Sequence, residues 1–486
     1  MWGGPFAGNE LNLQVLQQHH EDWGVVNKVM ATVIPNDLRV EVSNRQILKI
    51  ALPISFALLV PQINFITNNI FLGGLGEQEL GTAGLTGVYY LIFAAIGFGL
   101  NNGLQALIAR RAGENRVDEI GKLFSQGVRI ALIIAAIGIA LTFLVAPTIL
   151  KYSLHDQKVL QQSVHFLYIR IWGLPFLYIY QMRNALLVGT NQSKYLVIGT
   201  LAETIANIFF DYTLIYGKLG FPAMGFNGAA IASVIAEATG MLVVFAVIHR
   251  KGISKRFSLY KHFGYQKDIS KLILVQSSPL IFQHAISVIS WIFFYILVER
   301  HGYSQGHSNR DLAISNTMRN LFGFFGVFTW SFAATTNTMV SNVIGQGRKD
   351  LVISLVQKIV RISFCIALVI ALLLNFFPHV LLSVYGQDAS FVTDAIPVVR
   401  VVSSALVLMS FSTVWLNAVT GTGNSTVNLA IEAAAITLYC CYIYLVLEVF
   451  KWSITWGWMS EWLYWTTLFS LSYWYIRSGK WKKKEI

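Results

Sequence analysis

Long apolar runs, separated by short loops rich in charge or glycine, dominate this chain of 486 residues. Hydrophobic residues make up 55% of the sequence and charged residues only 12%, whereas soluble proteins carry about 25% charged residues. A helix needs roughly 20 mostly apolar residues to cross a bilayer. The sequence therefore predicts an all-α, polytopic membrane protein and excludes a soluble globular fold.

Twelve apolar segments can be delimited, which predicts twelve transmembrane helices. Six lie in the first half of the chain, near 47–71, 82–108, 123–148, 160–188, 195–217 and 227–249. Six lie in the second half, near 270–298, 312–344, 353–383, 391–419, 427–448 and 454–476. Lys and Arg follow the second, sixth, eighth and last segments, whereas the loop GGLGEQELG after the first has none. The positive-inside rule then places both termini in the cytoplasm, although Arg300 and Arg310 lie in an outer loop.

Two distant stretches of the sequence resemble each other. Residues 113–135 and 345–367 share nine identical positions of 23, all at an offset of 232 residues. The matches include Gly113 with Gly345, and shared hydrophobicity does not explain matches of glycine, arginine and aspartate. An even number of spans separates the two stretches, so equivalent helices share one orientation. Transporters built from such parallel repeats have their binding site between or within the halves.

The repeat predicts two six-helix lobes and three short cytoplasmic segments. In chain order these are an N-terminal extension 1–44, a lobe 45–250, a basic linker 251–268, a lobe 269–478 and a basic tail 479–486. Residues 1–29 lack the apolar core of a signal peptide. Met30 is an alternative start, and we hypothesise that residues 1–29 are dispensable. The formal charge of +12 lies in loops between spans and does not indicate nucleic-acid binding.

The fifth apolar segment carries three polar residues, Glu203, Asn207 and Asp211, at a spacing of four. At 100° per residue these side chains fall on one stripe of a helix. A charged residue at the bilayer centre costs on the order of 2.5–3.5 kcal/mol on insertion scales. The stripe is therefore expected to face protein or water, where a carboxylate can gain and lose a cation. The alternative is structural, because Arg170 can pair with Asp211 and Arg183 with Glu203.

Other polar or helix-bending residues lie within the predicted spans. Pro53 and Pro61 remove backbone donors in the first span and can bend it, and Gln62 and Asn64 lie beside them. A fixed kink is the alternative to a switching one. In the second half Gln283, His284 and Glu432 are candidates for a substrate path, and helix–helix hydrogen bonds are the alternative for them. The aromatic stretch EWLYWTTLFSLSYWYIRSGKW is interpreted as an interface belt.

Several ordered stretches resemble one family of transporters. The first span holds Pro53 and ends in TNNIFLGGLG, followed by LGTAGL, and the second ends in GLQALIARRAGENR. The eighth ends in TNTMVSNVIGQGRKD, and the fifth with its sequel reads NIFFDYTLIYGKLGFPAMGFNGAAIAS. Over residues 45–478 the chain thereby resembles the multidrug and toxic compound extrusion (MATE) family of cation-coupled exporters, prokaryotic type. The resemblance implies two six-helix lobes that form a V-shaped cleft.

The resemblance also implies an ion site in the first lobe. Asn207 and Asp211 match the family's Asn-x-x-x-Asp pair, and Asn184 matches an Asn of the fourth span. These three residues would bind sodium or, at the carboxylate, a proton. The family's acid on the first span would fall at Asn68, and the glutamate that other members carry on the seventh span at Ser287. Both are departures, so proton and sodium coupling remain open.

The sequence therefore predicts a secondary active exporter of small, mostly cationic or amphipathic compounds, driven by antiport with protons or sodium. A flippase for lipid-linked saccharides of a related fold and a passive channel are the alternatives. The motifs HExxH, GxSxG and GxxxxGK[ST] are missing, so an enzyme and ATP-driven transport are not expected. We expect no cofactor beyond the coupling ion, a monomer in contact with membrane lipid, and a bacterial inner (plasma) membrane location.

Overall fold

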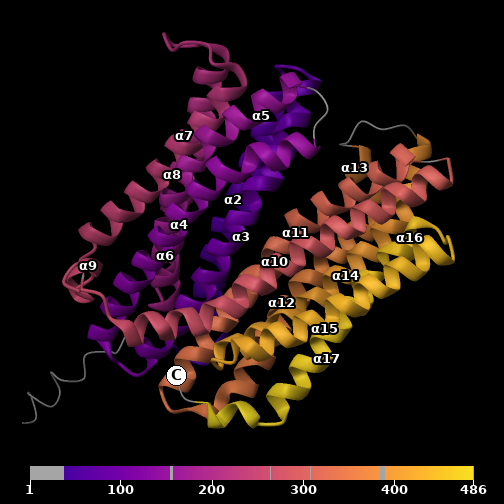
Figure 1. Ribbon diagram of the computed structural model, residues 1–486. Helices are drawn as coiled ribbons and strands as arrows, with labels where there is room; N and C mark the ends of the chain where they lie inside the picture. Colours follow the sequence, from indigo (N-terminus) through magenta and orange to yellow (C-terminus); the bar gives the residue numbers. More distant parts are fainter. Residues whose placement is uncertain (1–37, 154–156, 263, 307, 384–388, 485–486) are drawn as a thin grey trace, which may run out of the picture.

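A computed structural model of the chain describes residues 38–153, 157–262, 264–306, 308–383 and 389–484. All regular elements in these ranges are helices, as predicted (Figure 1). By length and composition alone, eight helices in the described part are apolar enough to cross a membrane. The others that match predicted spans are shorter, interrupted or more polar.

The first half of the chain forms one lobe. Its helices are α2 (Asn44–Gly73), α3 (Glu77–Gly113), α4 (Val117–Ser153), α5 (Gln157–Arg170), α6 (Leu174–Gly189), α7 (Leu196–Tyr216) and α8 (Gly225–Arg250). The predicted fourth span is thus two helices, α5 and α6, joined by the 3₁₀ helix η1 (Ile171–Gly173). Pro175 follows at the start of α6 and lacks a backbone N–H, so it fits a first-turn position there.

The second half forms the other lobe. Its helices are α10 (Lys267–Ser304), α11 (Ser308–Gly345), α12 (Val352–Phe376), α13 (Pro378–Ser383), α14 (Ala389–Gly421), α15 (Ser425–Tyr444), α16 (Ile454–Trp458) and α17 (Ser460–Arg477). The ninth span ends at Phe376 rather than at residue 383, because Pro378 begins the separate helix α13. The π-helix η4 (Leu445–Val449) continues α15. The predicted twelve spans and two lobes are otherwise confirmed.

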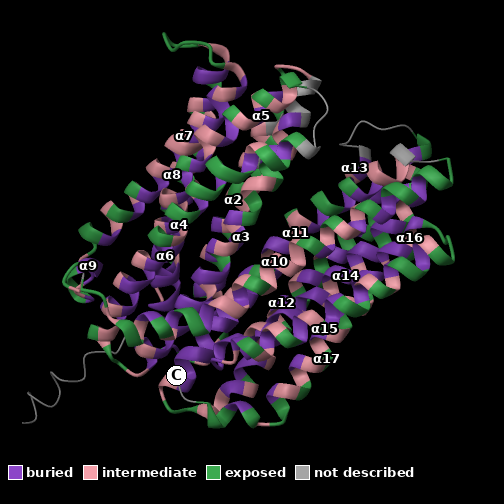
Figure 2. Ribbon diagram, in the orientation of Figure 1, coloured by how far each residue is buried: buried purple, intermediate pink, exposed green. Residues whose placement is uncertain are grey.

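The two lobes adjoin near the end that carries the C-terminus and diverge toward the other end (Figure 1). Contacts between them are made chiefly by α3 with α10 and α11, and by α2 with α11. Exposed residues lie along the helices of both lobes (Figure 2). Among them are large apolar side chains such as Ile70, Leu144 and Phe376, which are 67%, 75% and 73% exposed. Such surfaces are expected of helices that face lipid.

The internal repeat is preserved in space. A Cβ on Gly113 would collide with the backbone carbonyl of Asn342, and a Cβ on Gly345 would collide with that of Arg110. Arg110 and Asn342 are themselves 232 residues apart, so the two contacts are equivalent. Each half therefore contributes the same close backbone contact, and side chains larger than hydrogen are excluded at both glycines.

The segment before α2 is bound to both lobes. Asn342 Nδ2 donates to the carbonyl of Leu38 at 2.8 Å, and the backbone N–H of Val40 donates to Asn342 Oδ1 at 3.1 Å. Arg39 donates to the carbonyl of Gly113 at 3.2 Å. The part of the expected extension 1–44 that precedes Leu38, including Met30 and the region expected to be dispensable, lies outside the described residues.

The basic linker between the lobes packs on the first lobe. It contains the short helix α9 (Ile253–Arg256), followed by Phe257 and Leu259, which are buried. Ser125 of α4 donates to the carbonyl of Leu259 at 2.8 Å, and Gln126 of α4 donates to that of Gly264 at 2.8 Å. These hydrogen bonds and buried side chains therefore fix the linker against α4.

Candidate functional site

Asn207 and Asp211 lie deep inside the first lobe, on a face of α7. Asp211 is fully buried and Asn207 is 1% exposed, while Glu203, one turn earlier, is only half-buried. Helix α7 packs against α2 on one side and α8 on another. The predicted stripe therefore faces protein, as its polarity requires.

Asn68 of α2 joins this pair. With its amide nitrogen turned toward α7, Asn68 donates to Asp211 Oδ2 at 2.5 Å and to Asn207 Oδ1 at 2.9 Å. It also donates to the backbone carbonyl of Asn64 at 3.3 Å. The structure thus brings together the residue at the expected first-span position and the Asn-x-x-x-Asp pair. We call Asn64, Asn68, Asn207 and Asp211 the α2–α7 cluster.

The oxygens of the α2–α7 cluster are not all satisfied. Asp211 Oδ1 and Asn64 Oδ1 are buried and have no hydrogen-bond partner among the described residues. No Lys, Arg or His forms an ion pair with Asp211 in that part of the chain. A buried carboxylate with a free oxygen and neutral amide neighbours attracts a small cation. Carboxylate and amide oxygens are hard ligands, which suit a proton or an ion such as sodium and not a soft metal.

Arg170 does not pair with Asp211, which was the structural alternative. Its guanidinium instead forms a two-point ion pair with Glu237 of α8, at 2.6 and 2.9 Å. The ring of Tyr90 lies 3.7 Å from the Arg170 guanidinium, and its hydroxyl donates to Glu237 at 3.1 Å. Arg170 is thereby bound within its own buried group and forms no ion pair with Asp211.

The second expected pair, Arg183 with Glu203, does not form either. Arg183 donates to the backbone carbonyl of Met241 and lies 5.1 Å from the centre of the Phe245 ring. The Glu203 side chain packs against Gly240 of α8. Glu203 therefore lies on the α8 side of α7 and is not part of the α2–α7 cluster.

The remaining first-lobe candidates take different positions. Asn184 is half-buried on α6, and no hydrogen bond in the described structure links it to Asp211. Pro53 and Pro61 both lie within α2, which continues as one helix through them. Gln62 points to α11 of the other lobe, where its amide oxygen comes near Gly323. The first-lobe candidates thus do not form one group, because Gln62 faces the second lobe, Glu203 lies toward α8, and Asn184 is not linked to the α2–α7 cluster.

A second buried acid, Glu432 of α15, organises a polar group in the other lobe. Its carboxylate accepts from Tyr464 of α17 at 2.5 Å, from Ser287 of α10 at 2.9 Å and from Gln283 of α10 at 3.3 Å. Ser287 lies where the family resemblance implies a glutamate in other members. An acid from another helix therefore reaches that position. We call these four residues the α15 cluster.

His284 lies where the lobes meet rather than in the α15 cluster. Its Nε2 is 3.4 Å from the side-chain nitrogen of Asn102, and its ring lies 6.5 Å from that of Phe98, both on α3. Close packing of Gly99 against Ile281 holds α3 and α10 together at this level. The alternative predicted for His284, a helix–helix contact, is what the structure contains, and it joins the two halves.

Two tyrosines that donate to buried acids were not singled out from the sequence. Tyr464 lies within the aromatic stretch that was interpreted as an interface belt, and Tyr90 lies in an apolar span. Both are aromatic residues whose hydroxyl reaches a buried carboxylate, and a tyrosine has only this one polar group to reveal such a role. The signal available in the sequence is that Tyr464 lies in the same apolar segment as an acid, Glu461. The structure shows that Glu461 is buried.

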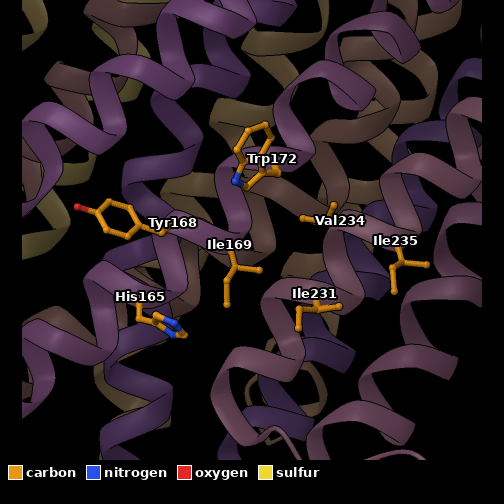
Figure 3. Close-up of a pocket in the computed structure, with 7 residues that line it drawn as sticks. All are labelled: His165, Tyr168, Ile169, Trp172, Ile231, Val234 and Ile235. Atoms are coloured by element: carbon orange, nitrogen blue, oxygen red, sulfur yellow. The ribbon is translucent and has the colours of Figure 1, made fainter.

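A groove of about 370 Å³ lies on the surface of the first lobe, between α5 with η1 and α8. Figure 3 shows the side chains that line it, which are His165, Tyr168, Ile169, Trp172, Ile231, Val234 and Ile235. The lining is mostly apolar and includes none of the predicted site residues. This groove is therefore separate from both acid clusters.

A family model identifies the kind of protein. The model of the MatE family matches residues 53–213 and 279–445, one stretch in each lobe and together more than half of the chain. The chain belongs to the MatE family. This assignment confirms the predicted family and the predicted multi-pass membrane transporter fold, with two homologous halves.

Related proteins and structures agree with the MatE assignment. The probable multidrug resistance protein NorM of Thermotoga maritima is 22% identical over 447 residues, 91% of this chain and 94% of that protein. The NorM protein of Synechocystis is 29% identical over 194 residues, 42% of its length. A MATE family transporter in an outward-facing conformation superposes with a TM-score of 0.83, at 17% identity, over 92% of this chain and 98% of the other. A MOP superfamily transporter from Pyrococcus furiosus gives 0.82 at 16% identity over 92% and 98%.

Proposed function

We propose that this MatE chain exports small, mostly cationic or amphipathic organic compounds by antiport with protons or sodium. One observation carries the proposal: Asp211 is buried, joined to Asn68 and Asn207, and left with an oxygen that no described residue satisfies. Holding an unpaired carboxylate in a protein interior costs several kcal/mol. A bound proton or sodium ion removes most of that cost, so the cluster favours a coupling cation.

Coupling requires that the cation bind one conformation more tightly than the other. The α2–α7 cluster lies within one lobe, but α2 also contacts the other lobe, where Ser55 Oγ lies 2.6 Å from Ser331 Oγ of α11. A cation that tightens α2 against α7 therefore changes the helix that joins the lobes. Pro61 interrupts the α2 hydrogen-bond ladder between these contacts, and Pro53 interrupts it just before Ser55; both are proposed as points that bend.

The proposed substrate path runs between the lobes. Gln62 of α2 borders it on one side, and Gln283 and His284 of α10 border it on the other. Asn64 is proposed to connect this path to the α2–α7 cluster, of which it is a member. Glu432 supplies a negative charge that favours cationic substrates, and Asn184 and Glu203 are proposed as accessory polar groups of the first lobe. The names of the NorM relatives, which describe multidrug resistance proteins, support this choice of substrate class.

The proposed topology follows the distribution of Lys and Arg. The boundaries 1–44, 45–250, 251–268, 269–478 and 479–486 are retained, with both termini and the linker in the cytoplasm and the chain in the inner (plasma) membrane as a monomer. The packed linker and the segment bound by Asn342 lie at the end where the lobes adjoin. In the described conformation the lobes thus diverge toward the outer side.

Counterflow in proteoliposomes tests the proposal. A fluorescent organic cation is the cargo, and a proton gradient and a sodium gradient are imposed separately on the wild type, on Asp211→Asn and on Asp268→Asn. Asp268 is an exposed carboxylate at the start of α10, so it controls for the loss of one charge. We expect one gradient to drive the wild type and Asp268→Asn, and neither to drive Asp211→Asn.

Equal gradient-driven transport by Asp211→Asn and the wild type would contradict the proposal. So would transport by the wild type that depends on neither gradient. Movement of a lipid-linked saccharide in place of the cation would favour the flippase alternative. Size-exclusion profiles of all three proteins establish that they insert and fold.

A further inference from the structure

A polar pocket lies at one end of the first lobe, far from the α2–α7 cluster. Its volume is about 310 Å³, and its walls come from the start of α2, the turn between α6 and α7, and the segment after α8 with α9. From the start of α7 to Asp211 the helix rises about 22 Å, at 1.5 Å per residue. The pocket is therefore separate from the proposed ion site and lies where several spans end.

Positive charge is concentrated in this pocket. Lys49, Lys194, Lys251 and Arg256 line it, and its lining includes no Asp or Glu. The three lysines are exposed, and none of them has an ion-pair partner among the described residues. Four cations around one small volume repel each other. An anion bound between them is attracted by all four and offsets that repulsion.

The walls of the pocket are held by fixed contacts. Gln46 of α2 donates to Asn191 Oδ1 at 2.7 Å, and Ser193 Oγ donates to the carbonyl of Ile50 at 3.3 Å. Lys194 lies 5.0 Å from the centre of the Tyr195 ring, and Ile253 of α9 is buried. The cations thus project from a rigid turn, a helix start and a docked linker, so little ordering is needed when an anion binds.

Apolar surface continues from the pocket along α7. Ile198, Leu201 and Ile205 follow Tyr195 on one face of the helix and are 45%, 45% and 66% exposed. A free phosphate ion would make no contact with this apolar surface. A phospholipid would place its headgroup phosphate among the cations and its acyl chains along these residues.

We propose that this pocket binds the headgroup of an anionic phospholipid from the cytoplasmic leaflet. The topology proposed above places these span ends at that leaflet, and anionic lipid there attracts each nearby Lys or Arg by about 1 kcal/mol. Bound lipid joins the start of α2 to the linker after α8. The site is distinct from the transport reaction and does not depend on the coupling ion.

Native mass spectrometry of the full chain, extracted from vesicles of phosphatidylcholine with or without phosphatidylglycerol, tests this proposal. The pocket variant is Lys49→Gln/Lys194→Gln/Lys251→Gln. The matched control is Lys480→Gln/Lys482→Gln/Lys483→Gln, which removes three charges near the cytoplasmic end of the second lobe. We expect the wild type and the control to retain one more phosphatidylglycerol than the pocket variant, with affinity falling about fivefold per lysine lost.

Equal retention by the pocket variant and the control would overturn the proposal. Competition with inorganic phosphate is the second arm, and displacement of the lipid at equal phosphate concentration would assign the site to a free ion instead. If the triple variant does not fold, Lys194→Gln alone, on an exposed side chain, must show the fivefold loss. Because the measurement is lipid binding, its result stands whether or not Asp211 couples transport.

Discussion

Asp211 in the first lobe and Glu432 in the second are both buried carboxylates on long helices, but their surroundings differ. Glu432 accepts hydrogen bonds from a tyrosine, a serine and a glutamine on two other helices. Asp211 is met by the amide of Asn68, and its second oxygen has no partner in the described structure. Three donors already stabilise the Glu432 carboxylate, whereas Asp211 gains most from a bound cation.

The internal repeat does not extend to these acids. At the offset of 232 residues, Asp211 corresponds to Ile443 and Glu432 corresponds to Thr200. The close glycine contacts, in contrast, are present in both halves. The scaffold is therefore duplicated while the charged groups are placed separately, which allows one lobe to bind the coupling ion and the other to bind the cargo.

Among the predictions, neutralising Asp211 or Glu432 is expected to change transport most, and the two substitutions are expected to act on different steps. Asp211→Asn removes the carboxylate, which is the one charged member of the α2–α7 cluster, and should abolish gradient-driven efflux. Glu432→Gln keeps an acceptor for Ser287 and Tyr464 and should weaken binding of a cationic cargo about tenfold, equivalent to about 1.4 kcal/mol. Counterflow measured over a range of cargo concentrations separates the two effects. Equal changes in gradient dependence and in cargo affinity for both variants would contradict the proposed difference between the lobes.

The Arg170–Glu237 pair can be tested by a double-mutant cycle. Arg170→Gln leaves Glu237 buried and unpaired and should destabilise the chain by about 3–5 kcal/mol. Glu237→Gln in the same chain should restore much of that loss, whereas Asp211→Asn should not. The midpoint of thermal unfolding in detergent measures both the loss of stability in Arg170→Gln and its restoration by the second substitution. Rescue by Asp211→Asn would mean that Arg170 pairs with Asp211 after all, and the contrast between the acids would fail.

The two glycine contacts should respond alike, unlike the two acids. Gly113→Ala and Gly345→Ala each force a methyl group against a backbone carbonyl and should cost about 1–3 kcal/mol. Gly84→Ala in α3 is the control, because no neighbour lies within 4 Å of its added Cβ. Thermal unfolding again provides the measurement. A large loss in one half and none in the other would contradict the equivalence of the two contacts.

Tyr464→Phe should have the smallest effect of the series. It removes one of three donors to Glu432 and should lower the free energy of unfolding by about 1 kcal/mol, with little change in gradient dependence. Tyr303→Phe, at a tyrosine that is 78% exposed, is the matched control. A loss of ion coupling in Tyr464→Phe would place the coupling group in the α15 cluster.

Much of this architecture could be predicted from the sequence, because it depends on local pattern. The twelve apolar segments, the 232-residue offset and the Glu203–Asn207–Asp211 stripe all follow from spacing along one chain. The approach of Asn68 to Asp211 followed from resemblance to a family, and the structure brings the two residues into contact.

The partners of the charged residues could not be predicted in the same way. The sequence suggests Asp211 as the partner of Arg170, whereas the structure pairs Arg170 with Glu237, and the choice depends on how α5, α7 and α8 rotate against each other. Likewise Glu432 meets Tyr464, 32 residues later, and Ser287, 145 residues earlier, through the packing of three helices. A helix pattern indicates which face is polar, but not which neighbour that face meets.

Counting the coupling cations bound by the purified protein tests the central claim most directly. Sodium binding by isotope and proton uptake by a pH-sensitive dye are measured in the same detergent for the wild type, Asp211→Asn and Glu432→Gln. The account predicts one cation per chain for the wild type and for Glu432→Gln, and none for Asp211→Asn. Full cation binding by Asp211→Asn, or its loss only in Glu432→Gln, would contradict the account.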